Sequence, residues 1–197
     1  MKDPVIRRAF HRSYLENEHS RPDTLVVDEL GLVHGKCRAD IAVINGHLIG
    51  YEIKSDSDTL VRLKNQIATY NAVFDHSSIV LEKRHLNEAL QSVPSWWGVI
   101  LVEKDGDYLI RFDTIREPTQ NPQIDDLAVA QLLWRDEALE ILIDLGIKGK
   151  RLRECRDNLY RYIIDLLDPL TLRRLVREYL KKRQIWRHLG PPFLCDD

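Results

Sequence analysis

Two apolar runs that flank an Asn-Gly pair constrain the fold of this 197-residue chain more than any other feature. They lie within residues 38–56, RADIAVINGHLIGYEIKSD, and each run carries charge: Asp40 in the first, Glu52 and Lys54 in the second. Asn-Gly between two such runs is typical of a β-hairpin. The sequence therefore predicts two paired strands that place three charged side chains at the edge of a core.

The register of this hairpin decides which way the charges point. With a two-residue turn at Asn45-Gly46, Asp40 would lie opposite Tyr51 and face away from Glu52. With a three-residue loop over 45–47, Asp40 would lie opposite Glu52. The second register is favoured because a one-residue slip would scatter charges into the core. It also collects five apolar side chains on the other face: Ile41, Val43, Ile49, Tyr51 and Ile53.

The favoured register brings two carboxylates together. Side chains directly opposite one another have Cβ atoms about 4.5 to 5.5 Å apart, and two like charges at that range raise each other's pKa unless a positive group lies between them. Mg²⁺ binds one or two carboxylates and keeps several waters and substrate phosphates. Ala42 and Gly50 are small residues on the same face, so the pattern predicts room there for a divalent metal and a ligand.

The rest of the chain predicts alternating helices and strands, followed by helices alone. Helical spacing or capping residues predict helices over 4–18, 55–74 and 85–93. Strands are expected over 24–32, 38–44, 48–54 and 77–83, with a further hairpin over 96–115 that turns at Asp105-Gly106. The proline-containing segment 116–123, REPTQNPQ, is typical of a boundary. Beyond it, helices are expected over 125–145, 150–167 and 170–189.

In this setting the charged residues resemble the PD-(D/E)XK nuclease superfamily. Asp40 matches the isolated aspartate of that motif, and Glu52-Ile53-Lys54 matches its acid-x-lysine element on the next strand. Ala39 stands where the name-giving proline would be. In the following helix, Gln66 and Tyr70 form a Gln-x-x-x-Tyr element that resembles the RecB-like branch, and residues four apart share a helix face. The pattern also resembles small bacterial relatives of the superfamily.

The resemblance implies a fold, an activity and a set of roles. The fold would be a restriction-endonuclease-like α/β core over residues 1–117, made of a helix, a three-strand meander, a helix and further strands in a mixed sheet, with an all-helical region over 123–190. The activity would be hydrolysis of phosphodiester bonds in DNA, with RNA left open, in DNA repair, recombination or defence by analogy. Mg²⁺ or Mn²⁺ would be held by Asp40, Glu52 and the backbone carbonyl of Ile53. Lys54 would orient or deprotonate the attacking water, and Gln66 and Tyr70 would position either the nucleic-acid backbone or the groups that surround the metal ligands.

A further acidic ligand often comes from upstream in this superfamily, and the segment VVDELGL offers Asp28 and Glu29. The turn around His34-Gly35 decides between them. A two-residue turn would align Glu29 with Asp40, so Glu29 is preferred as the additional metal ligand. Glu16 or Glu18, near the end of the first predicted helix, remains an alternative.

Charge is unevenly distributed along the chain. Residues 148–187 carry 13 Lys and Arg against 5 Asp and Glu, whereas the remainder has 16 basic and 26 acidic residues. A basic block is compatible with a polyanionic partner, and equally with solvated helix faces. The residues expected to contact nucleic acid crowd one predicted helix: Arg173, Arg174, Arg177, Lys181 and Lys182. The alternatives are that the same helices bind a protein partner or a second copy of the chain, or that they simply cover the sheet.

Several classes of protein are not expected from this sequence. No run approaches the roughly 20 apolar residues of a membrane span, and no apolar stretch suits a signal peptide, so a cytoplasmic protein with no membrane partner is expected. The chain has no Gly-rich phosphate loop and no His or Cys spacing typical of zinc. A different reading keeps the nuclease-like fold as a catalytically inactive module that binds nucleic acid or a protein partner.

Overall fold

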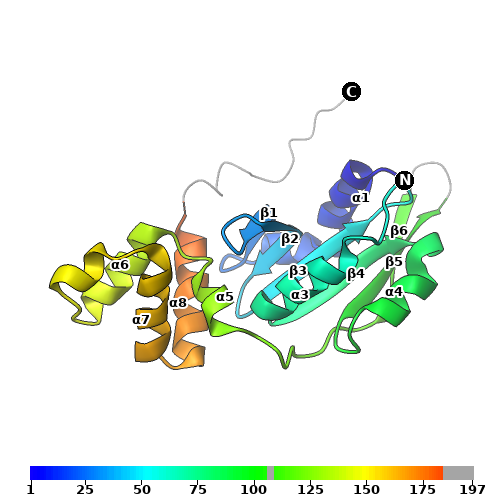
Figure 1. Cartoon of the computed structure of the whole chain (residues 1–197). Coiled ribbons are helices and arrows are strands. Elements are labelled where there is room, and N and C mark those ends of the chain that lie inside the picture. Colours follow the sequence, from blue (N-terminus) through cyan, green and yellow to red (C-terminus); the bar gives the residue numbers. More distant parts are fainter. Residues whose placement is uncertain (106–108, 184–197) are drawn as a thin grey trace.

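The structure, a computed structural model, describes residues 1–105 and 109–183. Six strands form one mixed sheet in the order of the chain (Figure 1). The first three strands form an antiparallel meander, β3, β4 and β5 run parallel, and β6 returns antiparallel to β5. The strands are β1 (Leu25–Leu32), β2 (Cys37–Ile44), β3 (Leu48–Lys54), β4 (His76–Glu82), β5 (Gly98–Asp105) and β6 (Leu109–Arg116). A mixed α/β fold, as expected, is confirmed.

Helices cover both faces of the sheet (Figure 1). On one face lie α1 (Asp3–Ala9), a π-helical turn (Phe10–Tyr14) and α2 (Glu16–Ser20). On the other lie α3 (Leu63–Val73), which connects β3 to β4, and α4 (Leu86–Ser92), which follows a 3₁₀ turn (Lys83–His85) and leads to β5. The sheet therefore separates two apolar clusters, one beneath α1 and one beneath α3 and α4.

The C-terminal helices pack beside the β1–β2 end of the sheet (Figure 1). They are α5 (Asp126–Ala130), α6 (Arg135–Asp144), a 3₁₀ helix (Gly149–Arg153), α7 (Arg156–Leu166) and α8 (Pro169–Lys182). One apolar cluster joins Tyr70 of α3, Leu81 of β4 and Val176 of α8, so this helical region shares its core with the sheet. None of the helices within 1–105 and 109–183 is long and apolar enough to cross a membrane.

The hairpin between β2 and β3 has the favoured register. Ile44 pairs with Leu48, and Ala42 pairs with Gly50, so the loop has three residues. The Asn45 side chain closes it by accepting a hydrogen bond from the backbone N–H of His47 at 2.9 Å. The predicted apolar face is also confirmed, since its five residues all belong to the cluster beneath α1. The alternation of apolar residues was a sufficient guide to the pairing.

Three predicted helices have different limits. The helix expected over 150–167 is divided into a 3₁₀ helix (Gly149–Arg153) and α7 (Arg156–Leu166). The helix expected over 55–74 begins only at Leu63, because the Asp58 carboxylate accepts hydrogen bonds from both the backbone N–H and the hydroxyl of Ser55, forming a turn. The helix expected over 125–145 is broken between Ala130 and Arg135. The predicted end of the last helix beyond residue 183, and the predicted turn at Asp105-Gly106, lie outside the described residues.

The space expected above Gly50 is filled by protein. The Phe74 ring is fully buried and lies against Gly50 so closely that a Cβ atom there would be 2.6 Å from two ring carbons. Ala42 is also buried in the same cluster. The prediction that these small residues leave room for a ligand was therefore wrong, because aromatic packing from the end of α3 takes that volume.

This packing predicts the effect of one added methyl group. Gly50→Ala should lower the free energy of unfolding by about 1 to 3 kcal/mol, because the ring must shift within a close-packed core. Urea denaturation measures the change. Gly46→Ala is the matched control, since a Cβ at that position meets nothing within 4 Å. Equal stability of the two variants would contradict the packing described here.

Candidate functional site

Four of the five predicted catalytic residues border one open pocket of about 960 Å³. Asp40 comes from β2, Glu52 and Lys54 come from β3, and Gln66 comes from α3. The fifth, Tyr70, lies one helical turn after Gln66 and is fully buried. Its hydroxyl donates a hydrogen bond to Glu52. The structure thus brings the whole predicted set together, because α3 crosses directly over the strands that carry the acids.

Glu52 is buried, and hydrogen bonds satisfy both of its oxygens. Lys54 Nζ lies 2.7 Å from Oε1, and Gln66 Nε2 donates to the same oxygen. The Tyr70 hydroxyl donates to Oε2 at 2.8 Å. Gln66 Oε1 also accepts from Lys54 at 3.0 Å, so the amide links the lysine to the acid. A carboxylate that is 1% exposed needs such partners, since an unpaired buried charge is strongly destabilising.

The environment of Asp40 disfavours the ionised form of its carboxyl group. Its Oδ2 accepts a hydrogen bond from the backbone N–H of Ile53 at 2.7 Å. Burial and then the charge of Glu52 raise the Asp40 pKa to about 7, against the opposing effects of the Ile53 N–H and Arg7. The Tyr70 hydroxyl connects the two acids, because it also accepts a hydrogen bond from the Asp40 backbone N–H at 3.3 Å.

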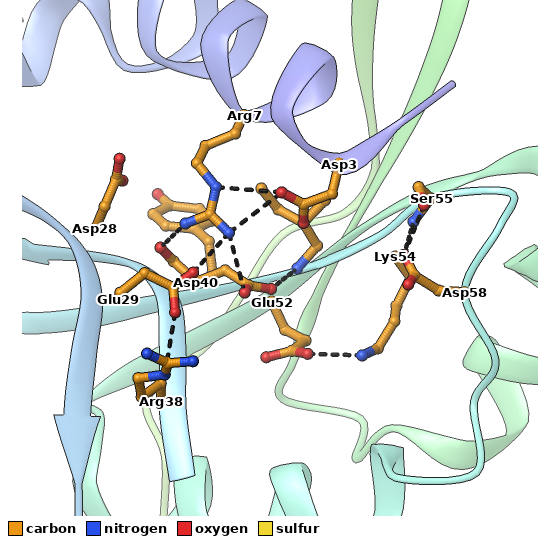
Figure 2. Close-up of polar contacts among 12 residues, drawn as sticks. Asp3, Arg7, Asp28, Glu29, Arg38, Asp40, Glu52, Lys54, Ser55 and Asp58 are labelled. Carbon is orange, nitrogen blue, oxygen red and sulfur yellow. Dashed lines mark hydrogen bonds and ion pairs between the residues drawn. The ribbon is translucent and has the colours of Figure 1, made fainter. Parts of the chain in front are cut away.

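Arg7 is a member of the site that the sequence did not reveal. From α1 its guanidinium reaches the Asp40 carboxylate at 3.2 Å, and it donates to the Asp40 carbonyl at 2.6 Å. It also lies 3.3 Å from Asp3 and 2.9 Å from Glu29 (Figure 2). Although burial alone lowers the pKa of Arg7, the surrounding acids raise it overall. Its separation from Asp40, 33 residues along the chain, leaves no local pattern that would identify the contact.

Glu29 lines the pocket and has an unusual backbone conformation. The pairs Asp28–Ile41 and Leu30–Ala39 flank it, so it stands opposite Asp40, the alignment expected for a turn at His34-Gly35. Its φ of 55° lies in the left-handed region, which is uncommon for a side chain of this kind. The Glu29 carboxylate contacts Arg7 and, at 3.2 Å, Arg38.

The alternative upstream acids lie elsewhere. Asp28 bonds to the ring of His11 at 2.8 Å and does not border the pocket. Glu18 pairs with Arg21 at 3.1 Å, and neither it nor Glu16 lines the pocket. Among the candidate upstream acids, Glu29 is therefore the one that the fold places opposite Asp40, although Arg7 and Arg38 are its partners.

The two central acids suit a hard divalent cation by chemistry. Asp40 and Glu52 supply carboxylate oxygens at the wall of an open pocket, which is the ligand type that Mg²⁺ and Mn²⁺ take. Burial and the charge of Glu52 raise the pKa of Asp40, because they disfavour its ionised form. A bound cation would favour the ionised form and so oppose this shift. Within residues 1–105 and 109–183, no three His, Cys, Asp or Glu side chains are placed to ligate one ion. The site therefore fits a divalent cation held by two carboxylates, with waters or substrate oxygens as its remaining ligands.

The five basic residues of α8 are engaged within the protein. Arg173 and Arg177 are mostly buried, and three of the five tie α8 to other segments of the chain. Their contacts are Arg173 with Asp126 at 3.2 Å, Arg174 with Glu178 at 2.8 Å, Arg177 with Asp75 at 3.9 Å, Lys181 with the Asp23 carbonyl at 2.9 Å, and Lys182 above the Tyr179 ring at 5.1 Å. A nucleic-acid contact by α8 stays a prediction, and the structure gives these side chains a second role in packing.

Comparison with known proteins relates this chain to a phage family. Protein cII of Enterobacteria phage P4 is 25% identical over 158 residues, which are 80% of this chain and 57% of that protein. The chain thus spans a little over half the length of this curated relative. A solved structure, the SPO1766 protein of unknown function from Silicibacter pomeroyi, aligns with 73% of this chain and 92% of its own at 17% identity and a TM-score of 0.44. The family described as Bacteriophage P4 protein cII matches residues 8–189, and the chain belongs to that family.

Proposed function

We propose that this protein is a metal-dependent nuclease that hydrolyses phosphodiester bonds, with DNA as the first substrate to test. The observation that carries the proposal is the convergence of Asp40, Glu52 and Lys54 on one open pocket. Gln66 and Tyr70 bind directly to this group. A role in DNA repair, recombination or defence rests on analogy alone.

The order of the elements supports the same proposal. A helix precedes the β1–β2–β3 meander, and α3 then leads to β4, which runs parallel to β3. This order is the one that the proposed restriction-endonuclease-like core requires. In the PD-(D/E)XK nucleases that this chain resembles, the acids stand on the second and third strands, as Asp40 and Glu52 do here.

The residues of the pocket would divide the reaction among them. Asp40, Glu52 and the carbonyl of Ile53 would hold Mg²⁺ or Mn²⁺. When bound, that ion would polarise the phosphate and lower the pKa of a bound water. Lys54, positioned by Glu52 and Gln66, would orient or deprotonate the water and stabilise the charge that develops on the phosphate. The Tyr70 hydroxyl would keep the two acid-bearing strands at a constant separation.

A second function is favoured by a specific observation. Arg7 contacts Asp40, and three donors satisfy Glu52, so the site is compensated in part without a metal. A nuclease-fold module that binds nucleic acid or a protein partner without cutting would keep such a network as structure. Activity measurements separate the two functions.

Cleavage in the presence of Mg²⁺ or Mn²⁺ tests the proposal. The wild-type protein should cut at least one of labelled single-stranded DNA, duplex DNA, branched DNA or RNA, and EDTA should stop it. Lys54→Met should lower the rate by about 10²-fold or more, since loss of one charge-stabilising donor in an enzyme site has that magnitude. Gel electrophoresis of the products measures the rate.

Lys64→Met is the matched control, because Lys64 is exposed on α3 and lies outside the pocket lining. Its rate should equal that of the wild type. Glu52→Gln is a second test and should also lower the rate of cleavage, because it removes a proposed metal ligand. The melting temperature of each variant shows whether the variant is folded. Absence of metal-dependent cleavage on all four substrates would instead favour the non-catalytic module.

Asp40→Asn tests the charge conflict independently of any substrate. Because the folded-state pKa of about 7 lies above the ordinary value of 3.8, the protonated carboxyl stabilises the fold at low pH, and this stabilisation is lost as the pH rises through 7. At pH 8 without metal, the variant should melt about 2 to 4 °C higher than the wild type, the shift that corresponds to 1 kcal/mol at this size. Mg²⁺ should raise the melting temperature of the wild type only.

Thermal melting at pH 6 and pH 8, with and without Mg²⁺, measures this effect. The gain of the variant should shrink at pH 6, where much of Asp40 is already protonated. An identical response of the two proteins to pH and to Mg²⁺ would show that Asp40 is not part of a shared charged site.

A further inference from the structure

Two cations at the pocket wall differ from the other basic residues there. Lys36 lies in the loop between β1 and β2, and Arg62 directly precedes α3. Both side chains are exposed, and both residues line the pocket. Among the residues that the structure describes, neither side chain has a hydrogen-bond or ion-pair partner. We call this pair the rim cations.

The other basic residues of the same pocket are already paired with acids. Arg7 contacts Asp40 and Glu29, Arg38 contacts Glu29, and Lys54 contacts Glu52. The rim cations therefore differ from their neighbours in having no partner to lose when an anion arrives. They also differ from the α8 residues Arg173 and Arg177, which are partly buried and paired.

The pocket wall offers unpaired cations to a phosphate backbone and no aromatic ring on which bases could stack. Its lining consists of charged, polar and aliphatic side chains, and no aromatic residue is among them. Base-independent and base-selective single-strand binders commonly stack bases on aromatic rings. In addition, no side chain caps the α3 N-terminus at Arg62, so the positive end of the helix dipole is available beside that guanidinium.

We propose that Lys36 and Arg62 bind phosphates of a nucleic-acid backbone next to the acid pair, and that this recognition is independent of base identity. The inference rests on the proposed function for the class of ligand, and it assigns the contacts of that ligand to the pocket wall. The loop before β2 and the start of α3 supply one cation each, so two separate segments grip the strand. Recognition of this kind is strongly salt-dependent, because each phosphate contact releases condensed counterions.

Fluorescence anisotropy with labelled oligonucleotides of about 20 nucleotides, longer than one typical single-strand site, tests the proposal in EDTA, where no cleavage occurs. The double variant K36Q/R62Q should bind roughly thirtyfold more weakly near 0.1 M salt, and its log–log salt slope should be smaller by about 1.4 to 1.8, the contribution of two contacts. Arg12→Gln with Lys150→Gln removes the same charge from two exposed residues outside the pocket and should change neither quantity. Homopolymeric and mixed-sequence oligonucleotides should bind with equal affinity.

Each other result overturns the proposal. Equal loss in the control pair would indicate a general charge effect, and a larger loss for R174Q/K182Q would assign binding to α8. A wild-type preference of tenfold or more between base sequences would contradict recognition of the backbone alone. The two proposals fail in different ways. If K36Q/R62Q cleaves as fast as the wild type, the phosphate-binding role of the rim cations is refuted. If binding depends on the rim cations but no cleavage occurs, only the proposed catalytic activity is refuted.

Discussion

The placement of Asp40 and Glu52 opposite one another on neighbouring strands, with one carboxylate partly and the other almost completely buried, is the constraint on which the rest of this structure depends. Asp40 and Glu52 stand on the face of the β2–β3 hairpin that α3 covers, where water cannot solvate both charges fully. The fold compensates with donors from three different elements. Arg7 comes from α1, Lys54 from β3, and Gln66 with Tyr70 from α3. The N-terminal helix, the meander and the crossover helix are thus joined through one polar cluster.

This compensation is unequal at the two acids, and the inequality has chemical meaning. Glu52 receives three hydrogen bonds and is almost completely buried. Asp40 shares the Arg7 guanidinium with Asp3 and Glu29, and its pKa is raised to about 7 by burial and by Glu52. The pocket therefore presents one acid with three protein donors and one that still attracts positive charge. A cation that enters from the pocket would relieve the conflict that the protein leaves in place.

The sequence could predict those parts of the site that depend on the regular spacing of residues along one strand or one helix. Apolar alternation decided that Asp40 faces Glu52, and spacing by four placed Gln66 and Tyr70 on one helix face. Arg7 could not be predicted, because its contact with Asp40 depends on how α1 lies across the sheet. Phe74 likewise fills the space over Gly50 through tertiary packing, which the small size of Gly50 does not specify. The start of α3 was misjudged because Asp58 bonds to Ser55 in a turn and does not cap a helix.

The basic C-terminal block shows how charge in a sequence can be used internally. Arg173 and Arg177 hold α8 against Asp126 and Asp75, so a positive balance in that region does not by itself describe a free surface. The unpaired cations at the acid pocket lie in an otherwise acidic part of the chain, where net charge gave no indication of them.

Metal binding by Asp40 and Glu52 can be tested directly in a crystal structure grown with Mn²⁺, examined for anomalous scattering at the pocket. We expect one peak bound by Asp40 and Glu52 oxygens at about 2.0 to 2.2 Å, the range of small divalent cations such as Mg²⁺. The Arg7 guanidinium should have moved away from the Asp40 carboxylate. The absence of any peak at millimolar Mn²⁺, with Arg7 still bound to Asp40, would show that the protein itself is the complete counterion of the acid pair and would contradict a metal-dependent site.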